Sequence, residues 1–287
     1  MLTINPKEVK SPIFHSYLLG AVAPRPIAFA STVDKDGNPN LAPFSFFNVF
    51  SGNPPIAIFS PARSGRTGVT KHTHDNIKEV PEVVINMVNY AMVQQTSLAS
   101  TEYPKGTNEF EKAGFTPLKS EMIKPFRVKE SPVQMECKVN QVIELGSQPG
   151  AGNLVICEVL LMHIDENILD ENKHIDPNRI DLVSRLGGNW YGRASGNALF
   201  QVEKPLMTMG IGVDGIPAVI RNSKVLTGNN LGQLGNVERL PSGEEVAEFK
   251  KANLQKNADE KSLHLKAKEY LDKGMVSEGW KTLLAGL

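Results

Sequence analysis

The segment between residues 23 and 61 constrains the fold of this chain more than any other part of it. Short apolar runs alternate there with Gly, Pro, Asn and Asp. Residues 26–33 and 56–59 are rich in β-branched and aromatic side chains, and the breaks that flank them are typical of strands. Asp36-Gly37 predicts a tight hairpin turn after the first of these strands. The segment therefore predicts the beginning of an antiparallel sheet.

A mixture of polar and aromatic residues lies between these two strands. Residues 42–45 are expected to form a loop with accessible backbone groups, and Pro43 stiffens it because its ring fixes one backbone torsion. Short polar side chains are interspersed with phenylalanines, which are Phe44, Phe46, Phe47 and Phe50. A site for a flat, partly polar ring needs this mixture, so we expect such a pocket here.

Strand patterns also dominate the chain as far as about residue 190. Residues 132–145 alternate apolar and polar side chains, as a half-buried strand does. Residues 153–164 form a longer apolar run that is expected to pair back across a turn, and residues 83–88 give a further strand. At least six strands, few helices and frequent turns predict an antiparallel barrel rather than a doubly wound sheet.

The composition is that of an ordinary globular enzyme. Of the 287 residues 40% are hydrophobic, which allows one large domain or one domain with an appendage. The 31 basic residues balance 31 acidic ones, so no general charge favours nucleic acid or an anionic membrane. We find no signal-peptide pattern and no apolar run long enough to cross a membrane. Cys137 and Cys157 are expected to be reduced structural thiols of a cytoplasmic protein.

Several motifs, in the same order along the chain, resemble those of the flavin reductase-like family. This family comprises FMN-binding split-barrel proteins, among them flavoredoxin and the reductase components of two-component monooxygenases. The motifs are PRPIAFAST, NLAPFSFFN, PPIAIFSP, KHTHDNI, EVVINMVN, ESPVQMEC and RLGGNWYGR. The resemblance implies a mainly β fold, in which residues 1–200 form an antiparallel FMN-binding split barrel with short helices. Residues 201–287 would then be a C-terminal extension.

The resemblance also implies which residues bind the cofactor, FMN. KHTHDNI matches the family pattern Lys-x-Thr-x-x-Asn-Ile, which makes Lys71 and Thr73 the phosphate-binding pair. A lysine point charge with a nearby hydroxyl suits a dianionic phosphate. The candidate cofactor-binding residues are Arg25, Ser31, Thr32, Ala42, Pro43, Phe44, Ser45, Phe59, Ser60, Arg66, Lys71, Thr73 and Trp190.

Some of these candidates also have an ordinary structural interpretation. Arg66 can be an exposed loop charge, and Ser31 and Thr32 can be simple strand-end hydroxyls. Trp190 and Tyr191 follow two glycines, whose freedom lets the backbone approach a flat group closely. These two aromatic residues either border the flavin, from the same or the neighbouring subunit, or form a core pair after a turn.

The activity that the resemblance implies is that of an FMN-dependent NAD(P)H:flavin oxidoreductase, a homodimer. Hydride passes from NAD(P)H to the flavin, which then reduces free flavin or another acceptor. Because the flavin carries this chemistry, no side chain is assigned as acid or base, and His15 is expected to be structural. Two alternatives remain open. One is a flavoredoxin-like electron carrier with little NAD(P)H activity, and the other is a non-catalytic module that binds flavin or haem.

Two further patterns are interpreted as structural. Residues 210–215 fit G-x-G-x-x-G, but Pro217 follows and no helix is expected to begin there, so a turn is predicted. His72 and His74 alternate like two ligands on a strand. No set of carboxylates or cysteines accompanies them, and no metal site is predicted.

The C-terminal extension is predicted to be rich in loops and then helical. Residues 242–245 carry a Ser-x-x-Glu helix start signal, and Val246 and Phe249 give that helix an apolar side. Residues 263–271 show the same spacing in a second helix, and the charged stretch around Lys256 is expected to be solvated. The apolar flank near Phe46, Phe47 and Phe50 is expected to be covered by dimerisation. Two short helices cannot bury their apolar sides against each other alone, so we expect them to clasp that dimer.

Overall fold

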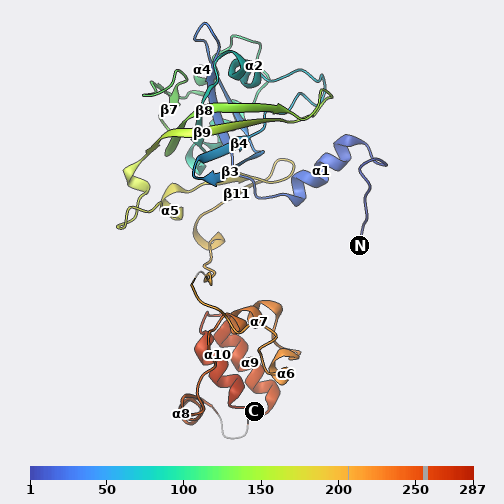
Figure 1. Cartoon of the computed structure of the whole chain (residues 1–287), viewed down its shortest axis with the longest axis vertical. Coiled ribbons are helices and arrows are strands. Elements are labelled where there is room, and N and C mark those ends of the chain that lie inside the picture. Colours follow the sequence, from blue (N-terminus) through green and yellow to red (C-terminus); the bar gives the residue numbers. More distant parts are fainter. Residues whose placement is uncertain (206, 255–257) are drawn as a thin grey trace. The chain divides into compact units, whose positions relative to one another are not determined.

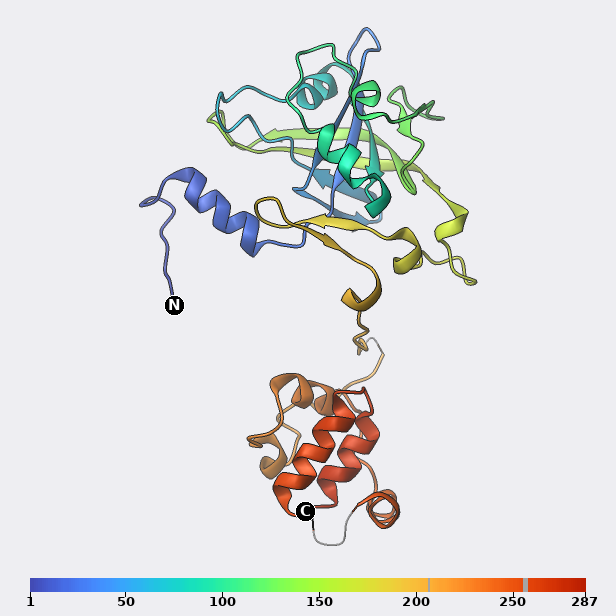
Figure 2. The same ribbon diagram turned by 180° about the vertical axis from the view of Figure 1, so that it is seen from behind.

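The chain divides into two compact units, Met1–Phe200 and Gln201–Leu287. The computed structural model describes residues 1–205, 207–254 and 258–287, so Lys256 of the charged stretch lies outside the described residues. Figures 1 and 2 show both units from opposite sides. Each unit has its own hydrophobic core, built from different residues.

A seven-stranded antiparallel sheet forms the centre of the first unit (Figure 1). Its strand order is β2-β1-β5-β8-β9-β4-β3. The strands are β1 (Ala28–Val33), β2 (Pro39–Phe44), β3 (Phe47–Gly52), β4 (Pro55–Phe59), β5 (Glu82–Met87), β8 (Val133–Glu144) and β9 (Asn153–Ile164). The predicted antiparallel β fold is confirmed, and so is the hairpin turn, where Gly37 adopts a positive φ of 86°.

The segment expected to be a loop at residues 42–45 is in fact mostly strand. Ala42 and Pro43 belong to β2, which pairs with β1 so that Pro43 lies opposite Phe29. A proline is tolerated there because β2 is an edge strand and needs no N–H on its outer side. The loop prediction was wrong because the polar and proline-rich composition of this segment masks a half-buried edge strand.

The sheet is curled, and the connection from β2 to β3 shows why. These strands are the two edges of the sheet, yet only Ser45 and Phe46 separate them in the chain. Two residues cannot cross a flat sheet of seven strands, because neighbouring strands lie about 4.8 Å apart. The two edges must therefore lie side by side, and Ser45 and Phe46 mark the opening of a split barrel.

Short helices surround the sheet, and α2 (His72–Glu79), α3 (Val93–Leu98) and α4 (Glu109–Ala113) pack near β1 and β2. β1 is consequently buried on both faces: Ala28 belongs to the cluster inside the barrel, and Phe29 to the cluster beneath these helices. By contrast, α1 (Ser11–Ala21) stands off the sheet without a buried residue (Figure 2).

The remaining elements of the first unit are small. They are η1 (Tyr90–Met92), β6 (Pro117–Leu118), β7 (Arg127–Val128), η2 (Glu166–Ile168), α5 (Pro177–Ile180), β10 (Val183–Arg185), β11 (Tyr191–Arg193) and η3 (Gly196–Ala198). Of these, the hairpin of β10 and β11 bears most on the candidate site. Its first strand is bridged to the start of the barrel, where Arg25 and Arg185 exchange backbone hydrogen bonds of 2.9 and 2.8 Å.

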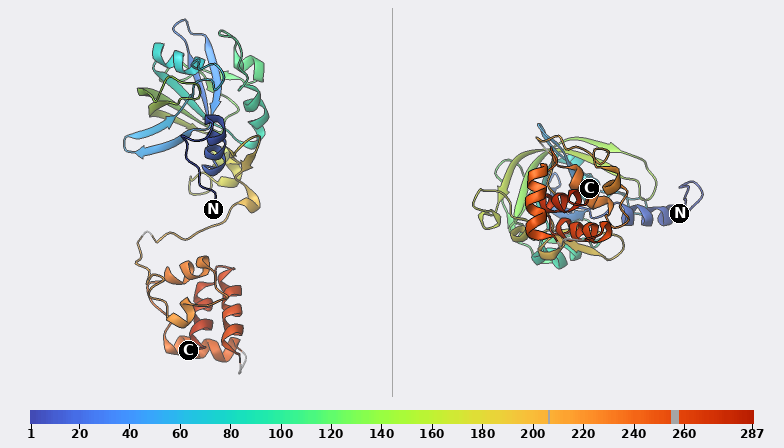
Figure 3. Two further views of the ribbon diagram at one scale, coloured as in Figure 1. Left: turned by 90° about the vertical axis from the view of Figure 1, so that its right-hand side faces the viewer. Right: turned by 90° about the horizontal axis from the view of Figure 1, so that it is seen from below.

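The described residues of the second unit form five helices, and α9 and α10 run side by side (Figure 3). The helices are α6 (Ala218–Arg221), α7 (Gly228–Gly235), α8 (Gly243–Asn253), α9 (Glu260–Leu271) and α10 (Val276–Leu284). The start signal at residues 242–245 is confirmed as a full capping box. At the centre of the unit lies Trp280, whose indole N–H donates to the carbonyl oxygen of Leu234 at 3.0 Å.

The second unit differs from its prediction in its helices and in how they pack. α7 and α10 were not predicted, because glycines at positions 228, 232 and 235 hide the helical pattern of α7. With these helices present, the apolar side of α9 is buried inside the unit rather than left for a dimer. A short helix also begins directly after Pro217, where none was expected; proline is compatible with a helix start. Residues 212–215 do form the predicted turn.

No helix among the described residues is both long enough and apolar enough to cross a membrane.

Candidate functional site

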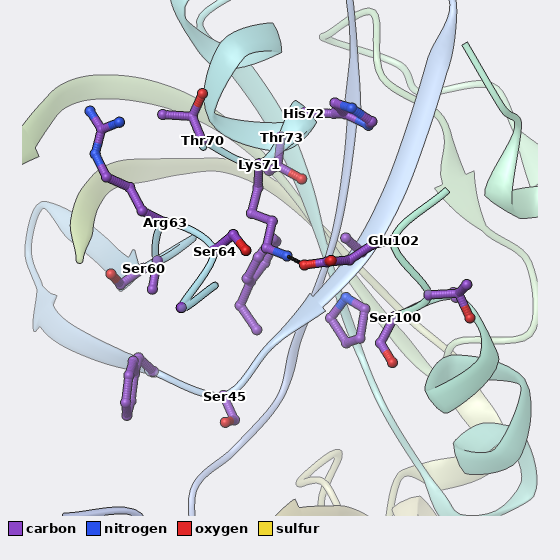
Figure 4. A pocket seen from close by; sticks show the side chains of 18 of the residues that line it. Ser45, Ser60, Arg63, Ser64, Thr70, Lys71, His72, Thr73, Ser100 and Glu102 are labelled. Carbon is purple, nitrogen blue, oxygen red and sulfur yellow. Dashed lines mark hydrogen bonds and ion pairs between the residues drawn. The ribbon is translucent and has the colours of Figure 1, made fainter. Parts of the chain in front are cut away.

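A cavity of about 630 Å³ lies in the first unit beside the opening of the barrel. Its walls come from the junction of β2 and β3, the loop of residues 60–70, the first turn of α2 and the segment that follows α3. Figure 4 shows side chains from these elements facing a common space. Segments far apart in the sequence thus share one site.

The start of α2 forms one wall of the cavity. Thr70, Lys71, His72 and Thr73 all line it, and Lys71 is the N-cap residue of the helix. The first N–H groups of a helix have no partner within the helix, and the helix dipole adds positive potential at this end. A helix start with a lysine and hydroxyl side chains is suited to binding a phosphate group.

Buried hydrogen bonds hold this helix start against the sheet. The Asn40 side-chain amide on β2 donates to the hydroxyl of Thr73 at 2.9 Å. The Asn76 side-chain amide on α2 donates to the hydroxyl of Thr32 on β1 at 3.2 Å. Four buried side chains from three elements therefore fix where the first turn of α2 lies, and Thr32 positions the cavity wall without lining it.

An ion-pair cluster lies near this wall of the cavity, and Figure 4 shows its contact between Lys71 and Glu102. Nζ of Lys71 lies 2.6 Å from Oε1 of Glu102, and Nη2 of Arg66 lies 2.7 Å from Oε2 of the same carboxylate. These hydrogen bonds, first that of Lys71 and then that of Arg66, hold the pKa of Glu102 below its usual range. Glu102 is therefore an anion at neutral pH and bridges two cations.

The opposite wall is partly apolar and comes from the barrel opening. Pro43, Phe44, Ser45 and Phe46 line the cavity there. Arg25 also lines the cavity, and its guanidinium donates to the carbonyl oxygens of residues 19, 22 and 186 and, at 3.4 Å, to the hydroxyl of Ser45. Burial, with the nearby charge of Arg185, lowers the pKa of Arg25. Arg25 thus braces the wall mainly through main-chain carbonyls.

The structure brings eight of the thirteen candidate cofactor-binding residues to this cavity, namely Arg25, Ala42, Pro43, Phe44, Ser45, Ser60, Lys71 and Thr73. It does not bring the other five there. Ser31, Thr32 and Phe59 are completely buried, because both faces of β1 and the inner face of β4 are covered. Arg66 is 82% exposed and reaches the site through Glu102.

Trp190 lies on the turn between β10 and β11, away from the cavity lining, and is 77% exposed. It is therefore neither a core residue nor in contact with the cavity. The close approach expected at the glycines occurs instead between Gly187 and Gly20, where an added Cβ would lie 3.4 Å from the Gly20 Cα. Tyr191 stacks beneath Arg185, whose guanidinium carbon lies 4.5 Å from the ring centroid.

Two titratable residues of the cavity depart from the sequence analysis, which took His15 as structural and did not name Glu109. His15 is exposed on α1, lines the cavity and meets Phe46 edge to face at 6.0 Å, so it is not a core histidine. Glu109 is buried at the start of α4 and accepts the backbone N–H of Leu41 at 3.1 Å. Burial raises the pKa of Glu109.

Other residues of the cavity were missed altogether. Glu102, Ser100 and Thr101 come from the segment after α3, whose turn-rich sequence carries no motif. Only the fold brings this segment opposite Lys71. Asn40 lies within the NLAPFSFFN motif. It pairs with Thr32 across the hairpin of β1 and β2, and this pairing could have indicated its role from the sequence.

The two histidines compared with metal ligands lie on helix α2, not on a strand. His72 lines the cavity, whereas His74 is buried and its Nδ1 lies 3.3 Å from a carboxylate oxygen of Asp75. Within the described ranges, no group of three or more His, Cys, Asp or Glu side chains is arranged to hold a metal ion.

These features fit a flavin mononucleotide in three respects. The cavity has room for a ligand of that class. The start of α2 with Lys71 and the buried Thr73 supplies donors for one phosphate group. Pro43 and Phe44, followed by Ser45, supply an apolar wall with a polar end for a flat ring.

Comparisons with known proteins agree with this fold. Residues 20–180 match the family model described as "Flavin reductase like domain". An uncharacterized protein of Aquifex aeolicus (strain VF5) is 36% identical over 196 residues, covering 68% of this chain and 97% of that protein. The chain therefore belongs to the flavin reductase-like family, and its first unit is a split barrel of that family.

Solved structures give the same result. Nitrilotriacetate monooxygenase component B from Bacillus cereus is 32% identical, with a TM-score of 0.66, over 70% of this chain and 98% of that chain. The 2-nitrobenzoate 2-nitroreductase of Pseudomonas fluorescens is 26% identical, with a TM-score of 0.63, over 73% of this chain and all of that chain. These likenesses support a flavin-related redox function. The family match ends at residue 180, so the second unit lies beyond it.

Proposed function

We propose that this protein is an FMN-dependent oxidoreductase that transfers hydride from NAD(P)H to flavin and then reduces free flavin or another acceptor. The observation that carries the proposal is the cavity at the barrel opening, where a lysine-capped helix start faces an apolar wall. The donors at the start of α2, with Lys71 and Thr73, suffice for one phosphate group, whereas the guanidinium of Arg63 on the neighbouring loop is taken up by carbonyl oxygens and Glu144. FMN is therefore favoured over FAD.

Each wall has a defined task in this proposal. Lys71, Thr73 and the first N–H groups of α2 bind the phosphate, while Pro43 and Phe44 pack against the ring system. Ser45, held by Arg25, and the main chain of residues 42–45 offer hydrogen bonds to the polar edge of the ring. When bound, FMN supplies a redox centre that takes hydride from NAD(P)H and passes electrons to an acceptor.

We assign no side chain as an obligatory acid or base. His15 is exposed at the cavity and is the titratable group best placed to exchange protons with solvent. Glu109 is occupied by the Leu41 N–H, which favours a structural task for that carboxyl. The cofactor's own chemistry makes neither residue necessary for hydride transfer.

The identity of the flavin and the activity can be tested separately. Flavin released by heat from the purified protein should have the mass of FMN; FAD as the sole species would contradict the proposed phosphate site. NADH or NADPH should be consumed in the presence of added FMN at a rate well above that of a flavin-free control. Bound flavin with negligible NAD(P)H consumption would favour the electron-carrier alternative, and a haem spectrum would exclude both.

We also propose a homodimer. Phe46 and Phe50 near the barrel opening are exposed, the latter by 66%, together with Ile13 and Tyr17 on α1. Phe47, which was expected to share this flank, is instead buried in the barrel core. Exposed apolar surface is stabilised by burial at roughly 25 cal/mol per Å², which favours a second copy over this flank. Light scattering of the full chain tests the proposal, and a monomer at micromolar concentration would contradict it.

The two cysteines bear on the compartment. Both are free and buried in the barrel core, where no disulfide joins them. Reduced thiols are typical of the cytoplasm, which is the location we propose.

A further inference from the structure

The cations around the cavity differ in what their donors contact. The guanidiniums of Arg25 and Arg185 donate to main-chain carbonyl oxygens. Arg63 donates to the carbonyls of residues 68 and 146 and to the carboxylate of Glu144. Lys71 is different, because the partner of its Nζ is a carboxylate that itself lines the cavity. The ammonium that should bind phosphate is thus paired with an internal anion.

That anion, Glu102, has the geometry of a bound oxyanion. One of its oxygens contacts Lys71 at 2.6 Å and the other contacts Arg66 at 2.7 Å. A phosphate group uses its oxygens in the same way when it bridges two cations. Figure 4 shows the Glu102 carboxylate at the tip of the Lys71 side chain, within the cavity. The carboxylate therefore lies where a phosphate oxygen bound by Lys71 would lie.

This contact is weak enough to be displaced. Glu102 is about half exposed, with 47% of its side chain accessible, and Arg66 is far more exposed. Exposed ion pairs contribute only about 0.2 to 1 kcal/mol each, because water screens them. The segment between α3 and α4 is anchored by the buried Ala99 and Glu109, while Glu102 between them is exposed. Nothing in the packing of Glu102 prevents its side chain from moving aside.

A phosphate dianion and the Glu102 carboxylate cannot share Lys71 without repulsion, since like charges at such distances disfavour each other. We propose that Glu102 competes with the phosphate of FMN for Lys71 and thereby keeps the flavin exchangeable. This inference rests on the proposed function, in which Lys71 binds that phosphate. Glu102 is accordingly an affinity-determining residue, and FMN behaves as a substrate that leaves rather than as a permanently held group.

The test is a pair of flavin titrations with Glu102→Gln, which keeps the size of the side chain and removes its charge. We expect Glu102→Gln to bind FMN roughly three- to tenfold more tightly than the unsubstituted protein. This factor corresponds to two exposed ion pairs, which the unsubstituted protein forms in its free state and Glu102→Gln does not. FMN release should slow by a similar factor. Affinity for riboflavin, which has no phosphate, should not change. Flavin fluorescence reports each titration without any turnover.

A matched control removes the same charge elsewhere. Asp36→Asn lies at the hairpin turn between β1 and β2, where Asp36 pairs with Lys35 at 3.4 Å and does not line the cavity. It should leave both affinities as they are. In a Lys71→Ala background, Glu102→Gln should lose most of its effect, because the cation for which Glu102 and the phosphate compete is gone.

The outcomes separate this inference from the proposed function. Unchanged or weaker FMN binding by Glu102→Gln, together with weaker binding by Lys71→Ala, overturns the competition and leaves the phosphate site in place. Equal tightening for FMN and riboflavin also overturns it, since the effect would not involve phosphate. If the unsubstituted protein binds neither flavin, the proposed function itself fails, and this inference with it.

Discussion

Replacement of Lys71 by alanine is the most direct test of the cavity as a phosphate site. A hydrogen bond to a charged group contributes about 1.5 to 3 kcal/mol. Lys71 has 35% of its side chain exposed, so water screens its contacts and the lower end of this range applies. We therefore expect Lys71→Ala to weaken FMN binding by about 1.5 kcal/mol, which is roughly tenfold in dissociation constant.

The ion pair between Lys71 and Glu102 should reduce the effect of Lys71→Ala on FMN affinity. In the free protein Lys71 is already paired with Glu102, and that contact is given up when phosphate binds. Part of the gain from the phosphate contact is thus offset, and the effect of Lys71→Ala should not approach a hundredfold. Titration of apo-protein with FMN measures the loss of affinity. Riboflavin should bind equally to Lys71→Ala and to the unsubstituted protein.

Lys78→Ala is the matched control. Lys78 lies on the same helix, α2, but pairs with Glu144 and does not line the cavity. A loss of FMN affinity that is the same in Lys71→Ala and Lys78→Ala would show that only the general charge of α2 matters. A loss shared equally by FMN and riboflavin would show that Lys71 acts on the ring or on the fold. Either result refutes the phosphate assignment.

Three further predictions concern stability and reactivity. Trp280→Ala should destabilise the second unit by about 3 to 5 kcal/mol in chemical denaturation followed by circular dichroism, because it empties a buried core position; an unchanged midpoint would contradict the assigned core. Burial raises the pKa of Glu109 in the folded protein, so stability should fall as pH rises from the unfolded pKa through the folded one. Glu109→Gln should flatten this dependence in melting experiments between pH 4 and 8, and an equally steep curve would argue against it. Burial raises the pKa of Cys137 to about 12, so neither it nor the buried Cys157 should react with a thiol reagent at pH 8 until the protein unfolds.

The barrel could be predicted from the sequence because the local sequence patterns agree with the packing of the fold. The alternation and length of β8 and β9 are visible in the sequence, and Asp36-Gly37 predicts the turn between β1 and β2. β2 was not readable as a strand, because proline and polar residues are acceptable on an edge where one side of the ladder is unpaired. The second unit was only half readable, since α7 is rich in glycine and is stabilised by tertiary packing.

The candidate site divides in the same way. Lys71 and Thr73 were found because a short motif places them together at a helix start. Glu102 was not, because a single acidic residue in a turn-rich segment becomes informative only when the fold sets it 2.6 Å from Lys71. Trp190 is a different case, in which the place near the flavin of its own chain and the place in the core were both wrong, while a place at the flavin of the neighbouring subunit stays a prediction. Its aromatic and glycine-rich surroundings suggest a ligand or a core, but the hairpin of β10 and β11 turns the residue outward.

The contact between Glu109 and β2 has a consequence for solubility. An edge strand with free N–H groups is a template on which other chains can add strands and aggregate. β2 is such an edge, but the Glu109 carboxylate occupies the N–H of Leu41, and α4 packs beside the strand. The same buried carboxyl that borders the cavity thus interrupts the row of donors that a foreign strand would need. On the other edge strand, β3, the side chains of Val49 and Phe50 are exposed.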